Sequence, residues 1–334
     1  MGGARCQNEA ELHMSDGGHT KFGILLVIAA MLVISVNDVI IKSLSGDYPL
    51  HQMIFVRSAI GLLIALGLLQ IEGGWQLLKT RHPVLHMVRA FSVALANMLF
   101  FAAIASLPLG LATGLFFVAP LFITLLSIPV LGAQVGPRRL LAVGLGLVGV
   151  AVMTGADITM PDAAPIWALA LPIAAAFCYA GTQILTAKLG VESRASAMVV
   201  YIQAMFLGIS IAMFAIAGDG RFATGLSNDS LQFLLRAWVW PAPEDHWRFA
   251  VLGVCGAIFG YAMSQAYRIG APASLAPFEY VALPLAFFWG WVVFAERPGI
   301  PVWIGAGLIA GAGIFVLWRE GQHGGNVPAK GPRR

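Results

Sequence analysis

Charged side chains are scarce in this chain of 334 residues: Asp, Glu, Lys and Arg make up 11% of it. A soluble domain has about 25%. Hydrophobic residues make up 59%, and the mean hydropathy is +0.82. So few charges cannot cover a water-facing surface, which excludes an ordinary soluble domain. The composition predicts an integral membrane protein whose apolar surface faces the lipid bilayer.

Several common functional motifs are also missing. The three cysteines, Cys6, Cys178 and Cys255, have no metal-binding spacing such as C-x-x-C. His82 and His86 are four residues apart, but no acid or cysteine accompanies them, so we expect no metal site. Basic residues stand singly between apolar runs, which argues against nucleic acid as a partner. No G-x-x-x-x-G-K-[ST] loop occurs, which argues against ATP-driven transport, and we expect no cofactor.

Ten apolar runs approach or exceed the roughly 20 residues that span a bilayer. Most are joined by short links with turn residues, so neighbouring helices should be antiparallel. The polar first 21 residues contain no apolar core of a signal peptide. The fold class is therefore predicted as an all-α integral membrane protein. Its ten transmembrane helices are expected at 22–43, 49–71, 83–106, 109–130, 138–156, 165–188, 195–217, 247–268, 273–294 and 301–318.

The one long connection, 218–246, combines leucines, Phe233 and two tryptophans. Tryptophan favours the membrane–water interface. We therefore expect an interfacial helix in an extracytoplasmic loop, with Asp229 or Ser230 as its N-cap.

Basic residues indicate the orientation in the membrane. With the N-terminus in the cytoplasm, 13 of the 20 Lys and Arg residues fall on the cytoplasmic side and 5 on the other. This bias predicts that both tails, 1–21 and 319–334, are cytoplasmic. The expected location is a bacterial inner (cytoplasmic) membrane, crossed in multiple passes.

The chain also resembles itself when shifted by 164 residues, without a gap. The aligned copies, 22–156 and 165–318, would each contain five helices, and an odd number gives them opposite topology. This arrangement is the inverted repeat of secondary transporters. The identical pairs are Pro108 and Pro272, Leu111 and Leu275, Ala112 and Ala276, Pro120 and Pro284, Pro137 and Pro301, and Gly149 and Gly313.

The segment from Tyr267 to Tyr280, followed by Gly290-Trp291 and Phe294-Ala295-Glu296-Arg297-Pro298, resembles a known family signature. It is similar to the second-half signature of EamA-type transporters of the drug/metabolite transporter (DMT) superfamily. Arg89, Leu107-Pro108-Leu109 and Thr113 resemble the matching first-half signature. The resemblance covers about residues 22–318. It implies a ten-helix bundle with alternating access and a central cavity between the halves, for amino acids, nucleotide-like cofactors, vitamins or other metabolites.

The chain departs from the family pattern at one position. Many members have an acidic residue after the fourth helix, in the position that Glu296 has in the second half. Here that region reads Leu131-Gly132-Ala133-Gln134, without an acid. Any role of such an acid in the first half is therefore absent.

Charged residues inside the membrane need a partner or water, since each costs roughly 2.5–3.5 kcal/mol on insertion scales. Asp38 is expected to pair either with Lys42, four residues along the helix, or with Arg57 across two helices. Arg89 and Glu279 lie at similar expected depth on the cytoplasmic side. They are expected either to form a coupled gate or to be a static buried pair. Asp38 and Glu279 are expected near opposite faces of the membrane.

Uncharged polar residues within apolar helices are further candidates, with interhelical hydrogen bonding as the alternative role for each. The candidate substrate-binding or gating residues are Asn37, Asp38, Arg57, Arg89, Asn97, Thr113, Tyr179, Gln183, Gln203, Tyr261, Gln265, Glu279, Tyr280 and Trp289.

These features predict a secondary transporter for a small polar or zwitterionic metabolite, amino-acid-like or cofactor-like. Alternating access is expected, and proton coupling is left open. A passive channel or facilitator is one alternative. A membrane-embedded enzyme is another, but no G-x-S-x-G or H-E-x-x-H motif occurs and we expect no catalytic residue. The expected partners are the small-molecule substrate and the lipid bilayer, and both a monomer and a homodimer are compatible with the sequence.

Overall fold

The computed structural model describes residues 3–80, 82–131, 141, 144–146, 148–152, 166–189, 193–225, 228–269, 275 and 278–323. The described residues form helices and connections, without a β-strand. The elements are α1 (Gly3–Leu44), α2 (Leu50–Glu72), η1 (Trp75–Leu78), α3 (Pro83–Ser106), α4 (Leu109–Phe116), α5 (Ala119–Leu131), α7 (Ile166–Leu189), α8 (Ala195–Ala217), α9 (Asp229–Leu235), η2 (Pro243–Asp245), α10 (His246–Ile269), α12 (Ala282–Phe294) and α13 (Ile300–His323).

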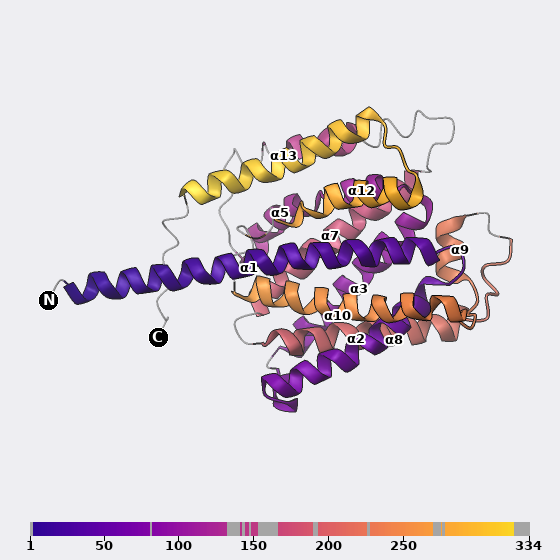
Figure 1. Ribbon diagram of the computed structural model, residues 1–334, viewed down its shortest axis with the longest axis horizontal. Helices are drawn as coiled ribbons and strands as arrows, with labels where there is room; N and C mark the ends of the chain where they lie inside the picture. Colours follow the sequence, from indigo (N-terminus) through magenta and orange to yellow (C-terminus); the bar gives the residue numbers. More distant parts are fainter. Residues whose placement is uncertain are drawn as a thin grey trace.

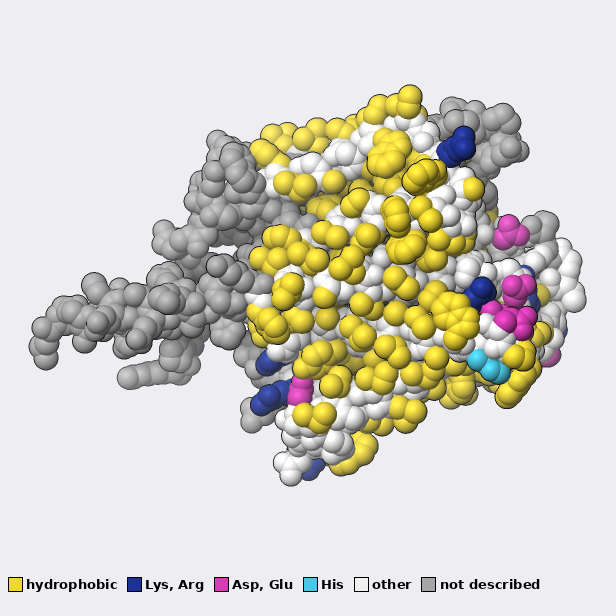
Figure 2. All heavy atoms as spheres, viewed as in Figure 1, with side chains coloured by type: hydrophobic (Ala, Val, Ile, Leu, Met, Phe, Trp, Pro, Cys, Tyr) yellow, Lys and Arg dark blue, Asp and Glu magenta, His cyan; other side chains and the backbone are white. Residues whose placement is uncertain are grey.

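Within the described residues, seven helical segments are long and apolar enough to cross a membrane. Two shorter apolar helices, Ala282–Phe294 and Ile300–Ala312, accompany them. Figure 2 shows a broad band of hydrophobic side chains between the two ends of the molecule, where the charged side chains of this face gather. Such a band suits the hydrocarbon core of a bilayer. The prediction of an all-α, multi-pass membrane protein is confirmed.

Most predicted helix ends agree with the structure to within a few residues, with clear exceptions. The first helix, α1, begins at Gly3 rather than at residue 22. The predicted helix 138–156 lies largely outside the described residues, although 144–146 and 148–152 are helical. The predicted single helix 109–130 is wrong, because α4 and α5 are separate helices with a turn at Phe117–Val118.

A second turn, at Tyr280–Val281, precedes α12 and divides the predicted helix 273–294. Each turn lies shortly before a proline, Pro120 or Pro284. Proline has no N–H to donate to the carbonyl four residues earlier, so a regular helix is interrupted there. Because the two prolines coincide under the shift of 164 residues, the two copies of the repeat are interrupted at corresponding positions.

The helices pack so that the two copies of the repeat are interleaved. The main neighbours are α1 with α10, α2 with α8, and α3 with α7. In Figure 1, α1 runs the length of the bundle beside α10, while α13 lies along its upper edge. Each of these pairs joins a helix of residues 22–156 to one of residues 165–318, so the boundary between the copies runs through the middle of the bundle.

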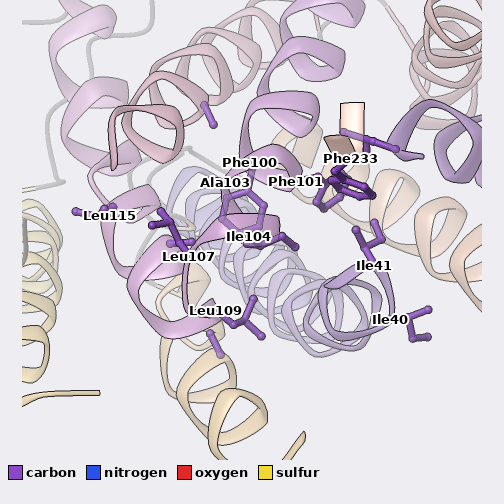
Figure 3. Close-up of a cluster of buried hydrophobic side chains, with 14 of the residues drawn as sticks. Ile40, Ile41, Phe100, Phe101, Ala103, Ile104, Leu107, Leu109, Leu115 and Phe233 are labelled. Atoms are coloured by element: carbon purple, nitrogen blue, oxygen red, sulfur yellow. The ribbon is translucent and has the colours of Figure 1, made fainter. Parts of the chain in front are cut away.

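The end of the bundle that carries α9 is filled with apolar side chains. Ile41 of α1, Ile104 and Leu107 of the α3–α4 corner, and Phe233 of α9 are buried there (Figure 3). The predicted caps of α9 are wrong: Asn228 is the N-cap, and its side chain accepts from the N–H of Leu231 at 3.0 Å. The helix is thereby fixed over the end of α3.

Gly149 provides a test of packing, because a Cβ there would lie 2.8 Å from the carbonyl oxygen of Gly305 on α13. Real Cβ atoms do not approach that closely, so Gly149→Val is expected to lower the free energy of unfolding by about 1–3 kcal/mol. Reversible unfolding of the purified protein in detergent measures this. Gly144→Val is the matched control, since a Cβ at Gly144 meets nothing within 4 Å. Equal losses in the two variants would contradict the close contact.

Candidate functional site

A cavity of about 100 Å³ lies between the two copies of the repeat. Its walls come from α1, α3, α4, α7, α10 and the segment around the start of α12. Four polar residues, Asp38, Asn97, Thr113 and Glu279, line it, and most of its other side chains are aromatic or aliphatic. The aromatic residues are Phe100, Phe101, Phe116, Phe117, Tyr179 and Phe259.

Both helix interruptions contribute to this cavity. Thr113 and Phe117 line it from the first interruption, and Glu279 lines it beside the second. The two interruptions touch, because the ring centroids of Phe117 and Tyr280 are 5.2 Å apart. Interrupted helices in corresponding positions of two repeats are typical of the substrate sites of secondary transporters.

Glu279 is held by two tyrosines from different helices. The hydroxyl of Tyr179 on α7 donates to its Oε2 at 3.1 Å, and the hydroxyl of Tyr267 on α10 donates to its Oε1. The residue is 3% exposed. Each hydroxyl stabilises negative charge on the carboxylate, since hydrogen bonds to a charged acceptor are the strong ones. Tyr179 and Glu279 were predicted site residues; Tyr267 was not.

Asp38 lies on the opposite wall. Its Oδ1 accepts from Nδ2 of the neighbouring Asn37 at 3.1 Å. Neither expected partner is within ion-pair distance, because Lys42 pairs elsewhere and Arg57 is separated from it by more than 4 Å. The expectation that Asp38 and Glu279 lie near opposite faces is wrong, since both line one cavity.

Arg57 is 4% exposed and stands behind the cavity wall. Its Nη2 donates to Oδ1 of Asn97 at 3.4 Å, and its guanidinium lies over the rings of Phe101 and Phe206, at 5.4 and 5.0 Å from their centroids. Such cation–π contacts partly replace water around a buried cation. The second wall residue in this contact, Asn97, faces the cavity itself.

Arg89 also lacks the expected acidic partner in this conformation. It donates to Oγ1 of Thr186 at 2.6 Å, to the Met198 carbonyl at 3.4 Å and to Oγ of Ser264 at 3.3 Å. No ion pair within 4 Å joins it to Glu279. Arg89 thus links α3 to α7, α8 and α10, as neutral acceptors from three helices surround one buried cation.

The partner of Lys42 is Glu296, at 3.1 Å between Nζ and Oε1. The same Nζ donates to the carbonyls of Ile104 at 3.0 Å and Leu107 at 2.7 Å. The other oxygen of Glu296 accepts from the N–H of Leu109 at 2.8 Å. This outer ion pair, Lys42–Glu296, therefore ties α1 and the α3–α4 corner to the connection that follows α12.

Two of the predicted site residues hold helices together away from the cavity. Gln203 packs against Gly61 where α8 meets α2, so closely that a Cβ on Gly61 would lie 2.4 Å from its Nε2. The hydroxyl of Tyr261 donates to Oε1 of Glu72 at 2.6 Å, which joins α10 to the end of α2. Neither residue lines the cavity.

Three more are placed outside it as well. Gln265 accepts from Arg268 on its own helix at 3.0 Å. Trp289 donates to Oγ of Ser35 at 3.2 Å, which joins α12 to α1. Gln183 is buried in α7. The cavity thus brings together Asp38, Asn97, Thr113, Tyr179 and Glu279 from the predicted set.

The phenylalanines of the cavity were missed by sequence reasoning. A phenylalanine in an apolar helix has the same local pattern whether it faces lipid or a cavity. The usable signal was the pair of coinciding prolines, Pro120 and Pro284, which marks the two interruptions that carry Phe116, Phe117 and Glu279.

Known proteins resemble the chain over most of its length. A riboflavin transporter of Brucella anthropi is 28% identical over 268 residues, which is 80% of this chain and 87% of that protein. An S-adenosylmethionine uptake transporter of Rickettsia prowazekii is 23% identical, over 89% of this chain and 93% of that protein. A solved crystal structure superposes with a TM-score of 0.63 at 17% identity, covering 91% of this chain and 99% of that one, which shows a shared fold.

The family model of the EamA-like transporter family matches residues 21–155. This match falls on the first copy of the repeat and includes Asp38, Asn97 and Thr113 of the cavity. The relatives extend the similarity through the second copy. Together with the membrane-spanning helices, these findings identify the protein as a transporter rather than an enzyme, and the chain belongs to the EamA-like transporter family.

Proposed function

We propose that the protein is a secondary transporter that moves a small, cofactor-like metabolite with a flat ring system across a bacterial inner membrane by alternating access. The observation that carries this proposal is the aromatic-lined cavity where the two interrupted helices meet. Aromatic walls with a few placed polar groups are typical of sites for small organic molecules. At about 100 Å³ the cavity is smaller than such sites usually are, so opening of one gate must widen it during transport.

We further propose ten spanning helices arranged as two inverted repeats, 22–156 and 165–318. The coinciding interruptions near Pro120 and Pro284 and the interleaved packing of the two copies support this arrangement. Both termini are placed in the cytoplasm, because 13 basic residues then lie inside and 5 outside. Helix α9 and the outer ion pair are then at the extracytoplasmic end.

Riboflavin is the first substrate to test, since the Brucella anthropi relative is named for it and a flavin ring can stack on the phenylalanines of the cavity. Purified protein in liposomes loaded with unlabelled riboflavin is expected to accumulate labelled riboflavin from outside. This counterflow is a property of a carrier, and a passive channel would not show it. The same assay with S-adenosylmethionine, and with an imposed proton gradient, compares the substrate of the second relative and tests ion coupling.

The control variants separate the cavity from the rest of the protein. Ala282→Phe fills the cavity and is expected to abolish counterflow. Ala204→Phe adds the same ring on the exposed side of α8 and is expected to leave it unchanged. Counterflow that survives Ala282→Phe, or that is absent for both compounds in the unmodified protein, would contradict the proposal.

A further inference from the structure

We propose that Asp38 and Glu279 make the cavity selective by charge, so that it admits neutral and positively charged aromatic solutes and rejects their anionic counterparts. This inference rests on the proposed transport function and names the substrate class of the same cavity. It makes the two carboxylates residues that determine specificity.

The first step is the charge of the lining itself. Two carboxylates face the cavity, and no lysine, arginine or histidine lines it among the described residues. Residues 270–277, which precede Glu279, contain no ionisable side chain. An anion that entered would meet two negative groups and no cation.

The second step concerns the unused hydrogen-bonding capacity of these acids. Both oxygens of Glu279 already accept from tyrosines. Asp38 accepts through Oδ1 from Asn37, while its Oδ2 has no hydrogen-bond donor among the described residues. A solute with an N–H, an O–H or a positive group can satisfy Oδ2, whereas a carboxylate or phosphate has no proton to donate.

The third step is the position of the two nearby arginines. Arg57 lies between the rings of Phe101 and Phe206 and reaches only Asn97 of the lining. Arg89 is surrounded by acceptors of α7, α8 and α10. Neither lines the cavity, so neither is placed to bind an anion there.

The aromatic walls act in the same direction. The face of an aromatic ring is electrostatically negative, so it attracts cations and repels anions. In a site that excludes water, like charges repel far more strongly than in solution. The walls and the two acids together therefore favour the same class of solute.

Three aromatic probes of similar size test the proposal: 2-phenylethylamine, 2-phenylethanol and 3-phenylpropionate, which are positive, neutral and negative at neutral pH. Thermal stabilisation of the purified full-length protein in detergent measures their binding. The amine and the alcohol are expected to stabilise it at concentrations about tenfold or more below that needed for the carboxylate. Riboflavin and riboflavin 5′-phosphate provide a second pair, in which the phosphate is expected to compete poorly.

Asp38→Asn and Glu279→Gln are each expected to reduce this discrimination, while Asp219→Asn in the exposed loop after α8 is expected to retain it. Asp38→Asn keeps the test valid if Glu279→Gln does not fold, since Asp38 bonds only its neighbour. Equal binding of the three probes, no binding of any, or unchanged discrimination in the variants would overturn the proposal. Discrimination without riboflavin counterflow would overturn the transported substrate alone, and counterflow without discrimination would overturn the charge selectivity alone.

Discussion

Tyr267→Phe is expected to lower the free energy of unfolding by about 2 kcal/mol, because it removes a hydrogen bond to a buried carboxylate. The hydroxyl of Tyr267 donates to Oε1 of Glu279, and the only other donor to that carboxylate among the described residues is Tyr179. Water cannot readily replace the lost donor at a residue that is 3% exposed. Unfolding of the purified protein in mixed micelles measures the loss, and transport should fall as well because Glu279 lines the cavity.

A double-mutant cycle shows whether this effect passes through Glu279. In a Glu279→Gln background, the same Tyr267→Phe change should cost less than about half as much, since a neutral amide is a weaker acceptor than a carboxylate. Additive losses would contradict the assignment. The matched control is Tyr280→Phe, one residue further along the chain. The hydroxyl of Tyr280 is buried without a hydrogen-bond partner in the described structure, so its removal should be neutral or slightly stabilising.

Lys42→Met is expected to open the extracytoplasmic end of the protein. The outer ion pair and the bonds of Lys42 to Ile104 and Leu107 hold α1 and the α3–α4 corner against the connection after α12. Removing one partner of a largely buried ion pair leaves the other uncompensated, which costs several kcal/mol. The closed arrangement should therefore lose stability relative to the open one.

Accessibility of the cavity measures this opening. A Thr113→Cys reporter is introduced after Cys6, Cys178 and Cys255 have been replaced by Ala, and a membrane-impermeant maleimide is added from outside. The labelling rate is expected to rise about tenfold or more with Lys42→Met, since each 1.4 kcal/mol changes the open population tenfold.

Arg248→Met is the matched control for this experiment. Arg248 also forms an ion pair near the same end, at 2.9 Å with Asp245, but its partner is three residues away and joins no second helix. Its loss should leave the labelling rate unchanged. A similar rise in the two variants, or no rise with Lys42→Met, would show that the outer ion pair does not close this end.

The outer ion pair has no sequence counterpart at the other end of the bundle. The shift of 164 residues that aligns the two copies places Gly132 at the position of Glu296. The first copy therefore has no acid with which to form an equivalent pair. Closure of the cytoplasmic end must rest on other contacts, and the bonds of Arg89 to α7, α8 and α10 are the strongest present among the described residues.

The sequence by itself determined the membrane class, most helix positions and the internal repeat. Each of these depends on local composition or on spacing along the chain: apolar runs of spanning length, turn residues between them, and prolines in register. The family signature around Glu279 and Glu296 was equally readable, because it is a pattern of neighbouring residues.

Only the tertiary structure decided which side chains meet. Lys42 pairs with Glu296, which is remote in sequence, rather than with Asp38 one turn away, because packing brings the α3–α4 corner and the end of α12 to the end of α1. Asp38 and Glu279 share a cavity although depth estimates along continuous helices had separated them. The phenylalanines became assignable to the cavity once the packing was known, because lipid and a protein interior select the same apolar residues.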